Sequence, residues 1–298
     1  MSAKKGLLCM FIASVLLSLG GLSFKMIPCN GMAINAVRNT ISVCLLLLFA
    51  KVTGRKLRFS LGVFIGACAM CATTTLYALA NKLTTAANTI LLQFTAPAFV
   101  ILLMLLFFHE KPRKLDIIAC VLVFGGIACF FLDSLGTGHI LGDFLALISG
   151  VSYALVFMMN KFPKADPLFA TILGQGMGAV IGFPFLMQET EFTSTAILYA
   201  IVLGVFQLGI ADMFFTTGIR YAPPVSASLV AGIEPILNPV LVAIVLGEML
   251  TPLAFVGGAI VFLVIMVYNV LNAIEENRAL KETRSPDMIE RRNGEGKG

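Results

Sequence analysis

The sequence predicts an all-α integral membrane protein of about ten transmembrane helices, arranged as two inverted five-helix repeats. Its 298 residues are 58% hydrophobic and only 12% charged, with a mean hydropathy of +0.95. A soluble domain with so little charge would lack the polar surface that water requires, so lipid is the expected solvent. Two further observations support this fold class: the distribution of the basic residues, and an internal match between the two halves.

A helix needs about 20 residues to cross a hydrocarbon core roughly 30 Å thick. We find about ten apolar segments of suitable length, near residues 6–27, 31–50, 59–80, 85–108, 115–133, 139–160, 167–187, 195–218, 224–247 and 252–273. The sequence therefore predicts a first repeat over 1–135, a second repeat over 136–274, and a charged, solvated tail over 275–298.

The basic residues indicate the orientation of the chain. With the N-terminus in the cytoplasm, nearly all of the 21 Lys and Arg residues fall in cytoplasmic loops or in the tail. Lys25 and Lys82 alone fall on the opposite side, and Arg38 lies inside a span. We therefore expect a multi-pass protein of the inner (cytoplasmic) membrane with both termini in the cytoplasm. The net charge of +5 reflects this topology and does not indicate a nucleic-acid partner.

The two halves match when the chain is shifted by 138 residues. Pro97 then aligns with Pro235, Glu110 with Glu248, and Leu115 with Leu253. In each copy an apolar helix carries a mid-span proline and ends at a glutamate, before a second apolar helix. Because each half has an odd number of spans, the second half crosses the membrane in the opposite sense, which is typical of secondary transporters.

Several motifs add a family resemblance over essentially all of 1–275. They are Ser18-Leu19-Gly20-Gly21, Arg38, Thr95-Ala96-Pro97, His109-Glu110, Ile233-Glu234-Pro235, Gly247-Glu248 and Gly257-Gly258. The chain resembles the drug/metabolite transporter superfamily, specifically its EamA-type ten-helix members, including YddG-like amino-acid exporters. Leu19 replaces a common tryptophan, and His109 replaces the usual glycine. The resemblance implies a central cavity lined mainly by helices 1, 3, 4, 6, 8 and 9, with helices 5 and 10 at the periphery as a possible homodimer contact.

Glu234 is the leading candidate for the substrate site. It lies about ten residues into the ninth segment, near the membrane midplane, where a charge is costly and usually functional. It precedes Pro235, which together with Pro97 is a candidate hinge because proline frees a backbone carbonyl. Small or polar residues share its helical face and the matching face of the fourth segment: Ala227, Ala231 and Asn238, and Thr89, Gln93 and Ala96. The alternative is a structural glutamate paired with Arg38 or with a hydroxyl group.

Two further charges lie inside spans. Asp212 is a candidate for proton coupling, as Glu234 is, or for the cavity lining; a salt bridge to Arg220 is the alternative. Arg38 is interpreted as a structural counter-ion. Additional candidates for orienting a polar solute are Tyr77, Tyr153, Gln207, Gln175 and Ser18, although such residues also join helices to one another.

The sequence favours a secondary transporter without a cofactor or metal. Its expected substrates are small polar or zwitterionic metabolites, amino acids first, in the direction of export and with or without proton coupling. Efflux of lipophilic cations or drugs, or import of a nucleotide-sugar or an amine, is the alternative. We find no HExxH, Gly-x-Ser-x-Gly or P-loop motif that would indicate an enzyme or an ATP-driven pump. Cys68 and Cys71 form a CxxC pair, but no histidine or second CxxC accompanies it, which favours buried thiols over a metal or redox site.

Overall fold

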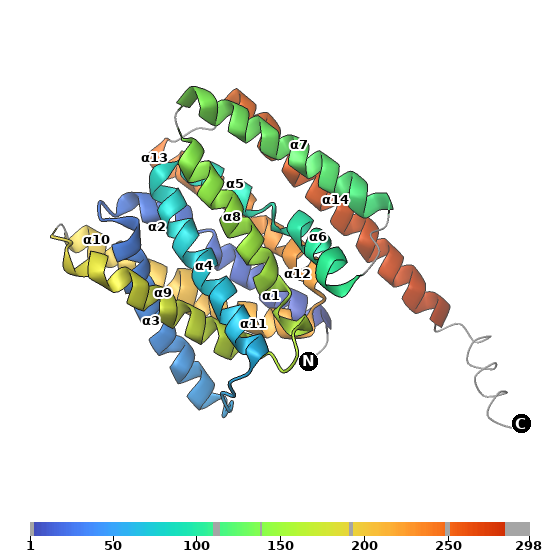
Figure 1. The fold of residues 1–298 in the computed structure, drawn as a ribbon, viewed down its shortest axis with the longest axis horizontal. Helices are drawn as coiled ribbons and strands as arrows, with labels where there is room; N and C mark the ends of the chain where they lie inside the picture. Colours follow the sequence, from blue (N-terminus) through green and yellow to red (C-terminus); the bar gives the residue numbers. More distant parts are fainter. Residues whose placement is uncertain (1–2, 110–113, 138, 191–192, 248–250, 284–298) are drawn as a thin grey trace, which may run out of the picture.

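The computed structural model describes residues 3–109, 114–137, 139–190, 193–247 and 251–283, and the regular structure in these residues is helical throughout (Figure 1). Glu110 and Glu248, aligned by the internal match, lie outside the described residues. The first half contains α1 (Ala3–Leu17), α2 (Gly20–Met26), α3 (Gly31–Val52), α4 (Leu61–Leu83), α5 (Ala86–Gln93), α6 (Ala96–Phe108) and α7 (Lys114–Thr137). The second half contains α8 (Ile140–Phe157), η1 (Met159–Lys161), α9 (Pro167–Met187), α10 (Ser194–Val202), η2 (Leu203–Ile210), α11 (Ala211–Tyr221), α12 (Pro224–Val230), η3 (Ala231–Ile233), α13 (Glu234–Leu246) and α14 (Pro252–Thr283).

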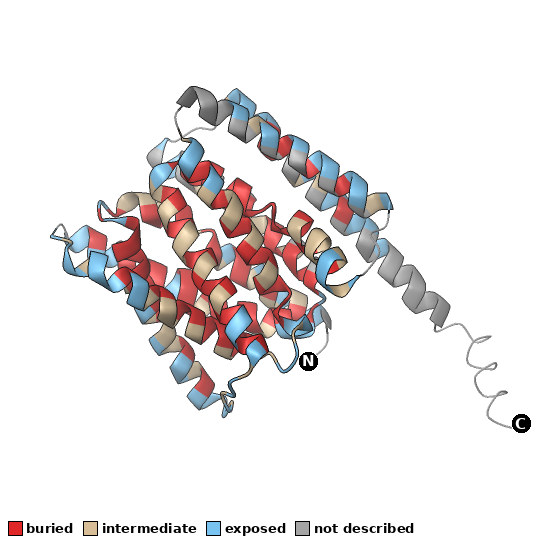
Figure 2. Ribbon diagram, in the orientation of Figure 1, coloured by how far each residue is buried: buried red, intermediate tan, exposed pale blue. Residues whose placement is uncertain are grey.

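Seven segments of the described chain are long and apolar enough to cross a membrane. They are Lys4–Met26, Gly31–Val52, Leu61–Leu83, Asn88–Phe108, Ile140–Phe157, Pro167–Met187 and Ser194–Tyr221. Each coincides with an expected span, and α7, the α12–α13 unit and α14 occupy the other three, so the fold is consistent with about ten spans. Buried residues concentrate in the helices at the centre (Figure 2), while large apolar side chains such as Leu48, Phe107 and Val180 are exposed on the outside, as a lipid-facing surface requires.

Local sequence sets where many of these helices begin. Asn30, Ser60, Thr85, Asp166 and Thr193 each precede a helix and accept a hydrogen bond from a backbone N–H of its first turn, at 2.8–3.3 Å. These side chains satisfy N–H groups that have no partner within the helix.

Helix boundaries recur at the 138-residue shift that the sequence match gave. The equivalent starts are Ala86 and Pro224, Ala96 and Glu234, and Lys114 and Pro252; the equivalent ends are Leu83 and Tyr221, and Phe108 and Leu246. Two pairs of equivalent helices pack on each other, α3 against α9 and α7 against α14, and the contact of α5 with α13 has its repeat counterpart in the contact of α12 with α6. In Figure 1, α7 and α14 lie side by side at the edge of the molecule and run in opposite directions, as inverted repeats require.

Apart from the π-helical stretch η2 between α10 and α11, three of the described spans are divided into two helices, and two of these breaks precede the predicted hinge prolines. α5 ends at Gln93 and α6 begins at Ala96, with Pro97 in its first turn; the turn of 3-10 helix η3 similarly separates α12 from α13, where Pro235 is the second residue. Proline is tolerated in a first turn because its missing N–H has no partner there. The third break, between α1 and α2, falls at Ser18 and Leu19.

His109 and Gly247 occupy equivalent positions just after α6 and α13. Both adopt left-handed backbone, with φ of 55° and 66°. Glycine adopts this conformation freely, whereas a residue with a Cβ is strained there by about 1–2 kcal/mol. The histidine found in place of the family's glycine therefore terminates its helix with the same geometry, under strain.

The last helix extends further than the sequence indicated. α14 continues without interruption from Pro252 to Thr283, beyond the expected span end near 273. Figure 1 shows its final turns projecting away from the remaining helices. The segment from 275 to 283 is therefore helical.

Candidate functional site

A central cavity holds the three charges that the sequence places inside spans. About 460 Å³ of empty space, part of it open to solvent, lies between its walls. Its lining residues are Leu17, Arg38, Met70, Thr73, Thr74, Tyr77, Gln93, Tyr153, Gln207, Leu208, Asp212, Phe215 and Glu234. These come from spans 1, 3, 4, 6, 8 and 9, the set implied by the family resemblance, with Arg38 added from span 2. The charged lining residues are two carboxylates and one guanidinium.

Glu234 is buried in the cavity wall, with 4% of its surface exposed. It is the first residue of α13, at the break that precedes Pro235. Its Oε2 has no hydrogen-bond partner within the described residues. A carboxylate in this setting is costly unless a proton or a cationic ligand neutralises it. Glu234 is not paired with Arg38, the alternative that the sequence left open.

Arg38 instead bonds to neutral oxygens. Its guanidinium donates to Asn35 Oδ1 at 3.0 and 3.2 Å, to the Thr74 carbonyl at 3.0 Å, and to Gln207 Oε1 at 3.2 Å. Its Cζ also lies 4.6 Å from the centre of the Phe24 ring. Four hydrogen bonds and an aromatic face therefore hold this buried cation in one orientation, which is a structural role at the edge of the cavity.

Asp212 is held by a different helix from the one the sequence suggested. Gln175 of α9 donates through Nε2 to Asp212 Oδ2. Arg220, the alternative partner, is exposed and lies near the Tyr221 ring, 5.8 Å from its centre. Gln175 does not line the cavity, so its role here is to position a carboxylate that does.

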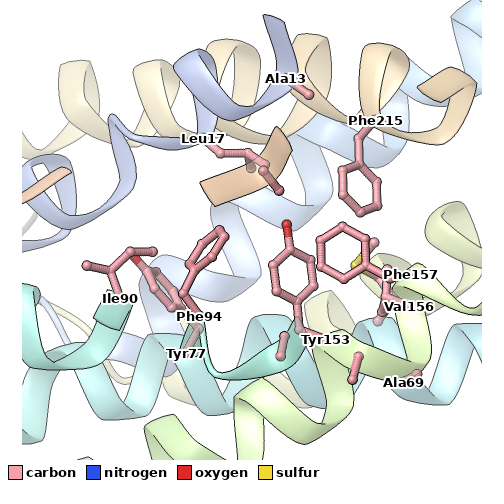
Figure 3. Packing of buried hydrophobic residues seen from close by; sticks show 14 of the residues in the cluster. Ala13, Leu17, Ala69, Tyr77, Ile90, Phe94, Tyr153, Val156, Phe157 and Phe215 are labelled. Atoms are coloured by element: carbon pink, nitrogen blue, oxygen red, sulfur yellow. The ribbon is translucent and has the colours of Figure 1, made fainter. Parts of the chain in front are cut away.

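One wall of the cavity is aromatic. Tyr153 lies parallel to Phe215, with ring centres 6.0 Å apart, and in contact with Phe157 at 4.5 Å and Phe94 at 6.1 Å. Figure 3 shows the Tyr153 hydroxyl pointing toward the space between Leu17 and Phe215. Such a wall accommodates apolar groups and attracts organic cations.

A stretch of π-helix, η2, interrupts span 8 at the cavity. It covers Leu203–Ile210 and carries two lining residues, Gln207 and Leu208. The wider turn changes the direction of side chains relative to a regular helix, and such stretches are frequent at functional sites. No proline or other sequence signal marks this irregularity.

The structure brings six predicted site residues together and places the others behind the wall. Tyr77, Gln93, Tyr153, Gln207, Asp212 and Glu234 line the cavity. Ser18 and Thr89 are buried, but their hydroxyls donate to the backbone carbonyls of Val15 and Thr85. Asn238 packs against Gly21, where an added Cβ would lie 2.3 Å from its Oδ1. Pro97 lines a separate apolar pocket of about 220 Å³ between α6, α7 and α14.

Several lining residues were missed because they are neither charged nor amide-bearing. Thr74 and Phe215 are the most informative of these. Shifted by 138 residues, Thr74 aligns with Asp212, and Phe215 aligns with Tyr77. All four line the cavity. The internal repeat therefore contained the signal, since the equivalent of a lining residue on a pseudo-two-fold axis also faces that axis.

At both ends of the helix bundle, side chains bind carbonyl groups near the ends of helices. At the end where α4 terminates, Lys82 Nζ donates to the Ile27 and Phe24 carbonyls at 2.6 and 3.1 Å, and Lys25 Nζ donates to Thr84 O at 3.0 Å. At the end where the chain begins, Asn160 Nδ2 donates to the Ile219 and Ala222 carbonyls at 2.9 and 3.3 Å. Thr84 and Ala222 are repeat equivalents, so Lys25 and Asn160 bind corresponding carbonyl groups.

Comparison with known proteins decides the family. The model of the EamA-like transporter family matches the chain twice, over residues 4–132 and 140–270. The chain belongs to the EamA-like transporter family. An uncharacterized transporter from Archaeoglobus fulgidus is 28% identical over 193 residues, which are 64% of this chain and 70% of that protein. One solved crystal structure has the same fold, with a TM-score of 0.68 at 16% identity, over 91% of this chain and 99% of the other.

Proposed function

We propose that this EamA-family transporter moves small zwitterionic metabolites, amino acids first, out of the cell across the cytoplasmic membrane. The single observation that supports this substrate class is Glu234, a cavity carboxylate at a helix break with an oxygen that the described protein leaves unpaired. A substrate ammonium group supplies the charge and the donors that this oxygen lacks. A proton on the same group provides the alternative neutral form, which couples transport to the proton gradient, with Asp212 as a second exchange site.

The inverted repeat supplies the mechanism. Exchange of conformation between the two halves would open the cavity to one face of the membrane and then to the other, and would break the Lys25–Thr84 and Asn160–Ala222 contacts in turn. The aromatic wall formed by Tyr153 and Phe215 favours efflux of lipophilic cations as the second candidate, because carboxylates and ring faces also suit a cation without a carboxylate.

Uptake by the purified protein in liposomes tests the proposal, with labelled amino acids and lipophilic amines as the substrate panel. Glu234→Gln should reduce uptake about tenfold to a hundredfold, because a bond to a charged group is lost. Glu189→Gln is the matched control: its Oε2 accepts from the Asn30 N–H at 2.8 Å, away from the cavity. Full activity of Glu234→Gln would remove Glu234 from the mechanism, and uptake of amines alone would favour the second candidate.

A further inference from the structure

A second group of polar atoms lines the cavity, and its members are hydrogen-bond donors. Arg38, Tyr77 and Gln207 come from three different spans and are all at least 95% buried. The side-chain amides of Asn81 and Asn238 lie near the Tyr77 hydroxyl, but neither has the distance and angle of a hydrogen bond to it, so the hydroxyl is unpaired among the described residues. A buried polar group left in this state is costly unless a ligand or water completes it.

Arg38 fixes the direction in which Gln207 presents its amide. The guanidinium is purely a donor, so the atom that it contacts at 3.2 Å must be the amide oxygen, Oε1. The Nε2 group, with two N–H donors, therefore points away from Arg38. Because Arg38 is itself held by Asn35 and the Thr74 carbonyl, this orientation does not depend on a mobile side chain.

Gln207 Nε2 and the Tyr77 hydroxyl both lie beside Gly20, and therefore close to each other. A Cβ at Gly20 would lie 3.1 Å from Gln207 Nε2 and 3.1 Å from the Tyr77 hydroxyl. The two donors are therefore no further apart than twice that distance, and both residues line the cavity. A carboxylate, with two acceptor oxygens, can bridge donors at such a separation.

We propose that Tyr77 and Gln207 form a subsite for the carboxylate of the substrate, with the charge of Arg38 behind them. This inference rests on the proposed function, in which Glu234 binds the ammonium group. The cavity then recognises both charges of a zwitterion and favours an amino acid over the amine that remains when its carboxyl group is removed. Among the described residues that line the cavity, Arg38 is the sole cation. A single positive charge suits one carboxylate better than a more highly charged phosphate group.

The test compares an amino acid with its decarboxylated amine, using binding measured by thermal shift and uptake into liposomes. Tyr77→Phe removes a hydroxyl and keeps the ring that packs against Phe24, with centres 5.8 Å apart. The substitution should weaken binding of the amino acid about tenfold, which corresponds to about 1.4 kcal/mol, and leave binding of the amine unchanged. Gln207→Glu keeps the oxygen that accepts from Arg38 but adds a negative charge to the subsite. It should therefore weaken binding of the amino acid more than Tyr77→Phe does, while binding of the amine is kept.

Tyr153→Phe is the matched control, since it removes another hydroxyl from the same cavity and should not change the ratio between the two ligands. Equal losses for both ligands in Tyr77→Phe, or no loss for either, would overturn the carboxylate subsite. Wild-type protein that prefers the amine would overturn the subsite and leave the role of Glu234 intact. Absence of binding by either ligand would overturn the proposed function together with the subsite.

Discussion

Replacing Gly174 by alanine should push α9 away from α4, a helix that lines the cavity. Gly174 of α9 packs directly on α4: an added Cβ would lie 2.5 Å from the Ala67 carbonyl oxygen and 2.7 Å from Met70 Cβ. Ordinary contact begins near 3.4 Å, so α4 and α9 must separate by roughly 1 Å. The obstacles are backbone and Cβ atoms, which no rotamer change removes.

The expected cost follows from two opposing effects. Overpacking destabilises by about 1–3 kcal/mol, while alanine improves helix propensity over glycine by up to about 1 kcal/mol. Gly176→Ala isolates the second effect, because no atom lies within 4 Å of its added Cβ. Gly174→Ala should therefore be less stable than Gly176→Ala by about 1–3 kcal/mol, or a few degrees in the unfolding midpoint.

Thermal unfolding of the two variants in detergent measures this difference, and uptake into liposomes measures its functional consequence. Met70, Thr73, Thr74 and Tyr77 of α4 all line the cavity, so displacing α4 should also reduce uptake. Gly176→Ala should transport normally. Equal unfolding midpoints for the two variants would refute the close approach of α4 and α9.

Two further predictions concern helix ends. His109→Gly should raise stability by about 1 kcal/mol because glycine relieves the left-handed strain, whereas Gly247→Ala should lower it by a similar amount; thermal unfolding of both variants checks this, and destabilisation by His109→Gly would contradict the assigned backbone. Lys25→Met and Asn160→Leu should each remove the bond to one of the equivalent carbonyl groups, those of Thr84 and Ala222, at a cost of roughly 1–3 kcal/mol. A membrane-impermeant thiol reagent should then reach a cysteine introduced at Thr73, in the cavity lining, faster from opposite sides in the two variants; the same direction of change in both would contradict the correspondence between the two contacts.

The sequence predicted the features that depend on composition and repetition. Charge depletion and apolar segment length require a membrane fold, and the 138-residue shift reproduces helix boundaries as distant as Leu83 and Tyr221. Glu234, Asp212 and Arg38 stood out because charges are rare inside a membrane. These signals are carried by residue type alone, and a single sequence displays them fully.

Side-chain direction was not predictable in the same way. Ser18 and Thr89 resemble cavity residues by type, but each hydroxyl bonds to its own helix, a choice that depends on rotamer and local crowding. The π-helical stretch around Gln207 changes the helical face by an amount that no 3.6-residue pattern anticipates. The partners of Asp212 and Arg38 come from distant segments, so they follow from the packing of complete helices.

The most direct test of the account is the accessibility of its central cavity from the two faces of the membrane. Thr73→Cys, in a background where the seven native cysteines are replaced, places one thiol in the cavity lining. A membrane-impermeant thiol reagent should modify this cysteine from either side of reconstituted vesicles, and an amino-acid substrate should slow the reaction from both. Modification from one side alone, or at a rate that no amino acid changes, would contradict a substrate path enclosed between two inverted halves.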